Sequence, residues 1–481
     1  MASHDLEEDG EGSPAEGSLA DTVVVSNRGP LSFRFEDGVP VAGEAAGGLA
    51  GSLGPMMAGT GATWVACSLG DADRAAAEAG LIPENGFHVE LVGPDPDVFN
   101  LAYNVVSNAM LWFCHHHLFD ASRRPRTDHR WPDAWDAYRQ LNEQFAERVA
   151  KVAPVGGRVL VQDYHLALMG SALARQRPDL RTVHFTHTPF ADPSVLRMLP
   201  TATGTELLSA MGGFGACGFH TERWAAAYRS NQSAPAPAPP GRTRAAGRAF
   251  VSALSVDPAA LAASVSDPAV PRALARIEEE VGDSTRQVIV RVDRMELSKN
   301  LLRGFWAFEE LLERQPGRRG RVVFVALAYP TRQGLPEYLA YQNEVESTVA
   351  RINQRFATPG WTPIILEVED DYQASLAALM RYDVLLVNPV RDGMNLVAKE
   401  GPLVNGRNGV LALSREAGAF EELWPAALEV NPFEVSGTAA VLAEALDMDA
   451  DQRARQSAEL RRLIVARRPT DWLRDQLAAA G

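Results

Sequence analysis

Short apolar runs alternate with stretches of helical spacing along most of the 481-residue chain. Four runs in the first half have the length and apolar character of strands, at residues 22–26, 63–67, 158–162 and 182–186. Between them, residues 133–152 and 166–176 repeat apolar positions at the helical period. Such alternation predicts an α/β fold, in which helices wrap a parallel sheet.

The same pattern returns in the second half of the chain. Its strand-like runs lie at residues 286–292, 322–328, 363–368, 384–388 and 409–413. Because Asp257 and Pro258 interrupt the pattern, the simplest account is two Rossmann-like, doubly wound domains, at residues 22–257 and 258–467. We expect the helix-spaced end, residues 468–481, to pack back on the first domain.

Two segments have compositions that disfavour regular structure. Residues 1–21 contain seven acidic residues and no Lys or Arg, which predicts a disordered acidic tail. Residues 230–241 contain four prolines, which predicts an exposed loop.

Composition and charge narrow the function classes. The net charge of −15 argues against a general affinity for nucleic acid or acidic membranes. No apolar run approaches the roughly 20 residues that cross a bilayer, and the N-terminus is acidic where a signal peptide is basic, so we expect a cytoplasmic protein. The three cysteines are widely spaced, which indicates neither a disulfide framework nor a cysteine metal site.

Residues 391–400 (RDGMNLVAKE) are the strongest single candidate for a binding site. They follow a strand-like run and open a helix-spaced segment. A strand, a turn containing Gly393 and a helix start leave several backbone N–H groups unpaired, which predicts an anion site. Glu400, about two turns further on, is placed to accept hydrogen bonds from hydroxyls. A sugar nucleotide would fit, and so would an ordinary strand–helix turn capped by an Asp.

Polar residues also follow other strands. Asp163 and His187 end neighbouring strands of the first domain, and Arg294 and Lys299 follow the first strand of the second. Ligands bind at this edge of parallel sheets. Two fixed cations there would stabilise the negative charge that grows on a leaving diphosphate. Arg332, after the next strand, could grip a second phosphate.

Other motifs carry little weight. Residues 213–218 (GFGACG) match the dinucleotide fingerprint by letter, but no strand-like run precedes them, which argues against a nicotinamide oxidoreductase. His115, His116 and His117 are contiguous and cannot easily all face one metal ion.

Taken together, the motifs resemble those of the trehalose-6-phosphate synthases, retaining glycosyltransferases of the two-Rossmann-domain (GT-B) type, whose domains face each other across a cleft. The resemblance runs in order from about residue 22 to the C-terminus. Its motifs are SNR (26–28), AGGL (46–49), YNVVSN (103–108), LW (111–112), DYH (163–165), HTPF (187–190), Arg294, SK (298–299), GWTP (360–363) and RDGMNLVAKE (391–400).

The resemblance implies a role for each candidate residue. Asp163, His187, Arg294 and Lys299 would be catalytic, with no metal or other cofactor required. The donor nucleotide would be bound by Arg294 and Lys299 together with Gly47, Gly48, Asp392, Gly393, Met394, Asn395, Leu396, Val397 and Glu400. The phosphorylated acceptor would be bound by Arg28, Tyr103, Trp112, Asp163 and Arg332. Both partners are small molecules, and a homodimer is left open.

Some residues depart from the family pattern, namely Val105, Val106, His115–His117, Thr186, Thr188 and Ala191. Within the family the chain most resembles the validoxylamine A 7′-phosphate synthases of validamycin-type antibiotic biosynthesis. These pseudo-glycosyltransferases join GDP-valienol to the amine of validamine 7-phosphate with retention. The alternatives are synthesis of α,α-trehalose 6-phosphate from GDP- or UDP-glucose and glucose 6-phosphate, and a catalytically silent regulator that binds a sugar phosphate.

Overall fold

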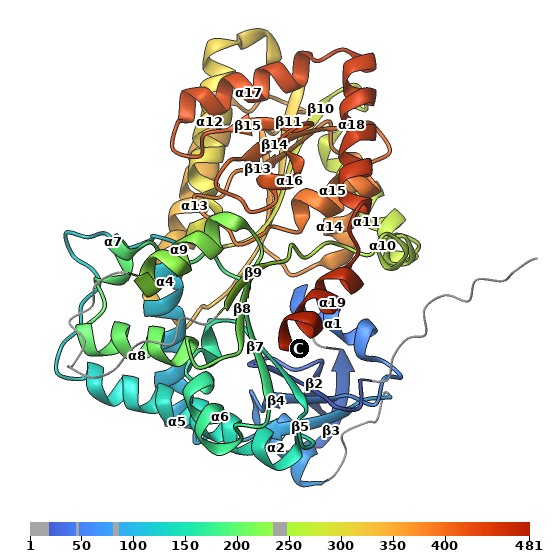
Figure 1. The fold of residues 1–481 in the computed structure, drawn as a ribbon. Coiled ribbons are helices and arrows are strands. Elements are labelled where there is room, and N and C mark those ends of the chain that lie inside the picture. The colour runs from blue at the N-terminus through green and yellow to red at the C-terminus, as the bar shows by residue number, and fades with distance from the viewer. Residues whose placement is uncertain (1–18, 45–47, 80–85, 234–247) are drawn as a thin grey trace, which may run out of the picture.

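Two parallel sheets form the framework of the molecule, one in each half of the computed structural model (Figure 1). The structure describes residues 19–44, 48–79, 86–233 and 248–481. The first sheet has the order β5 (His88–Val92), β4 (Thr63–Cys67), β1 (Thr22–Ser26), β6 (Arg158–Gln162), β7 (Arg181–Thr186), β8 (Ala216–Phe219) and β9 (Arg248–Val251). The second has the order β12 (Ile364–Glu367), β11 (Val322–Tyr329), β10 (Gln287–Arg294), β13 (Val384–Val387), β14 (Val410–Ser414) and β15 (Leu428–Val430).

Helices cover both faces of each sheet. Those in the first half are α1 (Gly48–Met57), α2 (Asp71–Glu78), α3 (Pro96–Asn100), α4 (Trp112–His115), α5 (Trp131–Val152), α6 (Met169–Gln176), α7 (Pro193–Leu196), α8 (Thr201–Met211) and α9 (Glu222–Ser233), with the π-helix η1 (Leu101–Leu111) and the 3₁₀ turn η2 (Tyr164–Leu166). Those after the first sheet are α10 (Pro258–Val265), α11 (Ala269–Val281), α12 (Leu301–Arg314), α13 (Pro336–Phe356), α14 (Tyr372–Arg381), α15 (Val397–Val404), α16 (Phe420–Leu423), α17 (Val435–Asp447), α18 (Ala450–Val465) and α19 (Pro469–Ala480), with the 3₁₀ turns η3 (Leu297–Lys299) and η4 (Pro316–Arg318). A hairpin of β2 (Leu31–Glu36) and β3 (Val39–Glu44) stands apart from both sheets.

The predicted α/β fold class is confirmed, and β1 shows why the apolar runs predicted it. Val23 and Val25 belong to one apolar cluster and Val24 to another, because successive side chains of a strand point to opposite faces. A strand buried on both faces must be apolar throughout. Every pair of strands in the two sheets is parallel, so their carboxyl ends share one edge.

Within the two sheets, the short strands β5, β8 and β15 were not predicted, and neither were β2 and β3 of the hairpin. The β8 strand begins in the second half of the GFGACG motif, residues 213–218, where glycines interrupt the apolar pattern. Residues 19–21 pack instead of belonging to a tail: Leu19 is buried, and Asp21 pairs with Arg158. Residues 230–233 are the last turn of α9 instead of a loop. The predicted segments 1–18 and 234–241 lie outside the described residues.

The chain crosses between the two halves twice, and the crossings lie side by side. Arg467, on the return, donates to the carbonyl of Ala253 at 3.0 Å and to the hydroxyl of Ser252 at 2.7 Å. The Ser255 hydroxyl donates to the carbonyl of Ile464 at 3.1 Å. The two crossings therefore form one tied connection.

After the second crossing, α19 packs on the first sheet (red, beside the blue and green half in Figure 1). Trp472 is fully buried and lies edge-on to Phe185 of β7, with ring centroids 5.2 Å apart. The last helix thus covers the sheet that the first strands build. None of the described helices is long and apolar enough to cross a membrane.

Candidate active site

The two halves of the molecule meet where β7 and β13 end. Gly393, in the turn after β13, lies against the backbone of His187, which follows β7. A Cβ atom on Gly393 would be 1.8 Å from the His187 carbonyl oxygen, so only glycine fits this contact. Trp224 donates from Nε1 to the Gly393 carbonyl at 3.0 Å. Strand ends that are far apart in sequence are therefore in direct contact.

Asp163 and His187 are joined by a hydrogen bond. The backbone N–H of His187 donates to Asp163 Oδ1 at 3.1 Å. Asp163 has φ 71° and ψ 167°, a conformation nearly restricted to glycine, and it costs about 1–3 kcal/mol in other residues. Burial raises the pKa of the Asp163 carboxyl to about 6, although nearby backbone N–H groups and Arg332 oppose this rise.

The His187 ring is neutral. Burial lowers its pKa well below the ordinary value, and the neighbouring His220 and His184 lower it further. Its Nε2 atom lies 3.0 Å from Oε1 of Gln162, the last residue of β6. A neutral imidazole can donate one hydrogen bond and accept another without releasing a charge into the site.

Lys299 and Arg294 lie at the end of β10, and each is paired with a carboxylate. Lys299 Nζ is 2.6 Å from Asp392 Oδ2, and Arg294 Nη2 is 3.1 Å from Glu296 Oε2. Burial opposes the charge on Lys299, but Asp392 and Asp293 more than offset it, so the pKa of Lys299 lies above its ordinary value. Both cations are fixed, and Arg294 remains partly exposed.

Arg332 connects the two halves of the molecule. Its guanidinium lies over the Trp112 ring, 3.9 Å from the centroid, and donates to the Tyr164 hydroxyl at 3.3 Å. It also pairs with Glu296, which is fully buried. Sequence reasoning assigned Glu296 no role, although its place between Arg294 and Lys299 was the available signal.

A buried pair holds the backbone behind Lys299. Arg291 is fully buried and binds Asp293 Oδ2 at 2.7 Å. The same guanidinium donates to the Lys299 carbonyl at 2.8 Å. The position of Lys299 is therefore determined by a charge pair within β10 as well as by Asp392.

The turn before α15 differs from the prediction in one respect. The helix begins at Val397, so Glu400 lies in its first turn instead of two turns in. Asn395 adopts φ 73° and donates from Nδ2 to Asp392 Oδ2 at 3.1 Å, while Met394 is buried in the core.

Leu396 is the N-cap residue and supplies no side-chain cap, so the first N–H groups of α15 have no partner within the helix. Burial raises the pKa of Glu400 to about 7.

The predicted acceptor residues lie along the edge of the first sheet. Tyr103, on η1, stacks on His165 with centroids 5.6 Å apart, and His165 is next to Tyr164, which Arg332 contacts. Arg28 is exposed on the loop after β1, which is adjacent to β6. These residues line the edge that also holds Asp163. Gly47 lies outside the described residues, and Gly48 is the first residue of α1.

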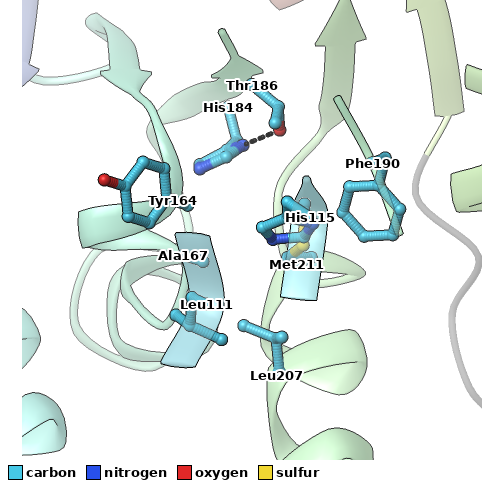
Figure 2. A pocket seen from close by; sticks show the side chains of 9 residues that line it. All are labelled: Leu111, His115, Tyr164, Ala167, His184, Thr186, Phe190, Leu207 and Met211. Carbon is cyan, nitrogen blue, oxygen red and sulfur yellow. Dashed lines mark hydrogen bonds between the residues drawn. The ribbon is translucent and has the colours of Figure 1, made fainter. Parts of the chain in front are cut away.

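Two hollows in the first half are separate from these residues. One lies between β7, η1 and α8, has mainly apolar walls and leaves no room for a water molecule (Figure 2). At its edge the Thr186 hydroxyl lies 3.4 Å from His184 Nδ1. The other, about 660 Å³, is a surface hollow between α5, α6 and α8, where Arg139 pairs with Glu206. Neither includes a predicted site residue.

The three contiguous histidines serve the structure of the first half. His116 stacks on Trp112 at 3.8 Å, and His115 Nδ1 accepts from the backbone N–H of Ala191 at 3.2 Å. His117 Nε2 lies 3.6 Å from Asp192 Oδ2. In the part of the chain that the structure describes, no group of three or more His, Cys, Asp or Glu side chains is arranged to hold a metal ion.

The geometry can support one kind of chemistry. Fixed cations and the start of α15 would bind a diphosphate, while Asp163 and His187 would face a ring attached to it. Among the described site residues no Ser or Cys is placed beside a base as an activated nucleophile, and the raised pKa of Lys299 keeps its amine protonated. Charge stabilisation and positioning are therefore what this arrangement offers.

Comparisons with known proteins give the arrangement a context. The model of Glycosyltransferase family 20 matches residues 20–480. The trehalose-6-phosphate synthase of Mycolicibacterium smegmatis is 31% identical over 483 residues, which are 96% of this chain and 93% of that protein. A bifunctional trehalose-6-phosphate synthase/phosphatase of Thermoproteus tenax is 32% identical over 485 residues, and there the match spans 95% of this chain but only 63% of the relative.

Solved structures agree with the sequence relatives. An α,α-trehalose-phosphate synthase (UDP-forming) from Burkholderia xenovorans in complex with glucose-6-phosphate has a TM-score of 0.82 and 27% identity, covering 95% of this chain and 99% of that one. A structure from E. coli with UDP-2-fluoro glucose bound has a TM-score of 0.82 and 28% identity, covering 95% and 98%.

Proposed function

The chain belongs to glycosyltransferase family 20, and from this premise we propose that it transfers glucose from a nucleotide diphosphate donor to glucose 6-phosphate, forming α,α-trehalose 6-phosphate. The observation that supports this most is the pair that Lys299 forms with Asp392 in the turn before α15, because the same turn contacts the strand end that holds His187 and Arg294 lies five residues before Lys299. The predicted family is confirmed. The donor, the acceptor and the roles of single residues are proposals.

We propose that the donor diphosphate takes the place of carboxylate partners. Lys299 is already held by Asp392, and Arg294 by Glu296. When the diphosphate binds between these cations and the N–H groups of α15, Lys299 moves from Asp392 to a phosphate oxygen. Asp392 is then free to accept a hydroxyl of the transferred ring, and Glu400 to accept the ribose hydroxyls.

The acceptor would bind along the edge of the first sheet. Its phosphate would be held by Arg28, Tyr103 and Arg332, with Trp112 as a wall. Asp163, which is mostly ionised above its pKa of about 6, would accept hydroxyls of the acceptor ring. Such positioning converts two bound reactants into one assembly ready to react.

In the proposed reaction, the acceptor hydroxyl oxygen forms its bond to the anomeric carbon on the face from which the diphosphate departs. The bond from that carbon to the donor phosphate oxygen breaks, and its electron pair leaves with the nucleotide diphosphate. The hydroxyl proton passes to that phosphate oxygen. Arg294 and Lys299 stabilise the charge that grows there, and the His187 carbonyl faces the positive charge on the ring.

We propose that no metal is needed, because the chain supplies the cations that would neutralise the diphosphate. Turnover in the presence of a chelator is therefore expected to equal turnover without it. Strong dependence on added Mg²⁺ would contradict this part of the proposal.

The second candidate is the pseudo-glycosyltransferase reaction between GDP-valienol and validamine 7-phosphate. The departures from the family pattern at Val105, Val106 and His115–His117 motivate it. The names of the relatives and of the solved structures favour the glucosyl reaction instead. The cyclitol reaction therefore stays a prediction and becomes one arm of the test.

The decisive experiment offers the purified protein three donors with their acceptors, and follows nucleotide release and product mass. GDP-glucose and UDP-glucose are paired with glucose 6-phosphate, and GDP-valienol with validamine 7-phosphate. Trehalose 6-phosphate as the main product is the expected outcome. Coupling of the cyclitol pair with little activity on glucose would overturn the substrate assignment, and tight binding without turnover of any donor would indicate a regulator.

A further inference from the structure

The last helix of the chain reaches the back of the His187 ring. Trp472 of α19 lies 5.6 Å from that ring, centroid to centroid. One helical turn further on, Gln476 is fully buried, and its Oε1 accepts from Gln162 Nε2 at 3.0 Å. Gln162 in turn contacts His187 Nε2 through Oε1. Gln162 therefore links His187 to α19.

The direction of this chain of hydrogen bonds is determined at Gln162. Its Nε2 also donates to the backbone carbonyl of Leu160 at 3.2 Å. A carbonyl can only accept, so the amide nitrogen of Gln162 must face Leu160 and Gln476. The amide oxygen then faces His187 Nε2 and can only accept from it. Nε2 of His187 must therefore be the protonated ring nitrogen.

We propose that α19, acting through Gln476 and Gln162, holds His187 in the tautomer with the proton on Nε2, so that Nδ1 is a hydrogen-bond acceptor for a hydroxyl of the donor ring. Gln162 and Gln476 are positioning residues in this proposal, because they act through His187. The role given to Nδ1 rests on the proposed glucosyl transfer. The tautomer assignment rests on the hydrogen bonds of Gln162 alone.

Two further observations agree with this assignment. His187 is only partly buried, and in the described part of the chain Nδ1 has no recorded hydrogen-bond partner. Burial and the nearby His184 and His220 keep the ring neutral, so Nδ1 retains its lone pair. A ring that flipped or changed tautomer would offer an N–H donor to the same hydroxyl, which is a different contact.

The first test needs no substrate. The protein is labelled with ¹⁵N-histidine, and the nitrogen shifts of His187, assigned with a His187→Gln variant, report which ring nitrogen carries the proton. We expect Nε2–H in the unmodified protein and a mixture of tautomers in Gln162→Met, which has a similar volume but no amide. The Nδ1–H tautomer or an imidazolium at neutral pH in the unmodified protein would overturn the proposal.

The second test measures turnover in matched variants. Gln162→Met is expected to lower kcat about tenfold, the worth of one hydrogen bond of about 1.4 kcal/mol, with little change in the KM for the acceptor. Gln476→Met should lower kcat less than Gln162→Met does. Gln476→Glu keeps an acceptor oxygen for Gln162, so its kcat should equal that of the unmodified protein. The control is Gln232→Met on α9, which also removes an amide, half-buried and bonded to the Leu208 carbonyl at 2.9 Å. The control should match the unmodified protein in both tests.

The outcomes separate this inference from the proposed function. Unchanged turnover in Gln162→Met, with an altered tautomer, would overturn the functional part of the inference. A kcat in Gln476→Glu as low as in Gln476→Met would point to packing instead of the hydrogen bond and would also overturn it. The unmodified protein could also form no trehalose 6-phosphate while its His187 carries the proton on Nε2, and Gln162→Met could lose that tautomer. This result would overturn the glucosyl reaction and leave the tautomer assignment standing.

Discussion

Each cation of the proposed donor site has a carboxylate partner in the protein: Lys299 pairs with Asp392, and Arg294 pairs with Glu296. These carboxylates therefore offset, already in the folded protein, part of the free energy that is lost when the cations are removed from water. In the proposed reaction, an entering diphosphate would exchange one anionic partner of these cations for another. Because the negative charge on the diphosphate would grow as its bond to the sugar breaks, the two cations would stabilise the transition state more than the bound donor.

Removing either cation is expected to lower turnover. Arg294→Ala and Lys299→Ala should each reduce kcat by roughly a hundredfold or more, because the leaving diphosphate loses a fixed positive charge. Steady-state nucleotide release measures the effect. Lys151→Ala, on an exposed position of α5, is the control and should leave kcat unchanged. Near-normal rates in both site variants would contradict the assignment.

Asp163 combines backbone strain with a buried carboxylate, and both act against stability. Its pKa is raised by burial from 3.8 to about 6, so its ionisation destabilises the folded state. The penalty is absent well below pH 3.8, grows as pH rises and is complete above about pH 6. In the proposed function this loss of stability is tolerated because an ionised Asp163 is needed to accept a hydrogen bond from a ligand hydroxyl.

Asp163→Asn is expected to trade activity for stability. The amide keeps an oxygen for the His187 N–H but carries no charge, so the free energy of unfolding at pH 8 should rise by about 1–3 kcal/mol. The gain should shrink as pH falls from about 6 towards 3.8. Denaturant unfolding across this range measures it, with turnover reduced in parallel. A gain independent of pH would assign the effect to packing.

For single residues, the sequence predicted candidate site residues that lie at strand ends, but it did not predict the side chains that contact them. Arg294, Lys299, Asp163 and His187 could be predicted to lie near strand ends, because the carboxyl ends of parallel strands share one edge of the sheet. Glu296 and Gln476 could not be assigned roles, since their partners are set by tertiary contacts between distant segments. Gln476 contacts a residue 314 positions away, and no local pattern encodes such a pair.

The turn between β13 and α15 is the element on which the site depends most. Gly393 faces His187, and a Cβ atom on Gly418 would lie 2.0 Å from the Gly393 carbonyl oxygen, so two glycines allow three segments to pack. The turn also presents the unpaired N–H groups of α15. Its sequence predicted a βα turn correctly, but the helix starts later than expected because Asn395 adopts a positive φ.

Gly393→Ala is expected to disable the site without unfolding the protein. The added methyl cannot fit against the His187 carbonyl, so the turn must move away from the first half and take Asp392 with it. Turnover should fall by more than tenfold, since displacements near 1 Å cost that much or more. Gly406→Ala, where a Cβ atom meets nothing within 4 Å, is the matched control. Similar kcat in the two variants would contradict this.

For the molecule as a whole, contacts between the halves gather beside the site. Arg391 of the second half donates to the Phe190 carbonyl at 3.0 Å and lies over Trp224, 4.6 Å from the ring centroid. Arg223 pairs with Glu416 across the same boundary. The halves are therefore joined at two places, by the tied crossings and by the contact of Arg391 with Phe190 and Trp224, which we call the closure contact.

Removing the closure contact is expected to open the molecule. Arg391→Ala should increase the radius of gyration measured by small-angle X-ray scattering and lower turnover about tenfold, because reacting groups on opposite halves separate. Arg415→Ala, whose side chain pairs with Glu429 within the second half at 3.4 Å, should change neither. An unaltered scattering curve for Arg391→Ala would show that other contacts suffice for closure.

The alternation of apolar runs predicted two parallel sheets, because a strand covered on both faces must be apolar throughout. Apart from the neighbours β6 and β7, it did not predict which strands lie side by side, nor the tie between the crossings. Those depend on contacts such as Arg467 to Ala253, which join segments more than two hundred residues apart. The fold class was therefore accessible from local pattern, and the relation between the halves was not.

The position of α19 has a consequence for synthesis on the ribosome. Trp472 and Leu473 belong to the same apolar cluster as Val24 and Leu160, so the first sheet has an uncovered face until the last helix emerges. Domains generally fold in the order in which they are synthesised. Here the first half of the molecule cannot complete its core until the second half and α19 have been translated. Throughout that interval, a nascent chain exposes the apolar surface that chaperones recognise.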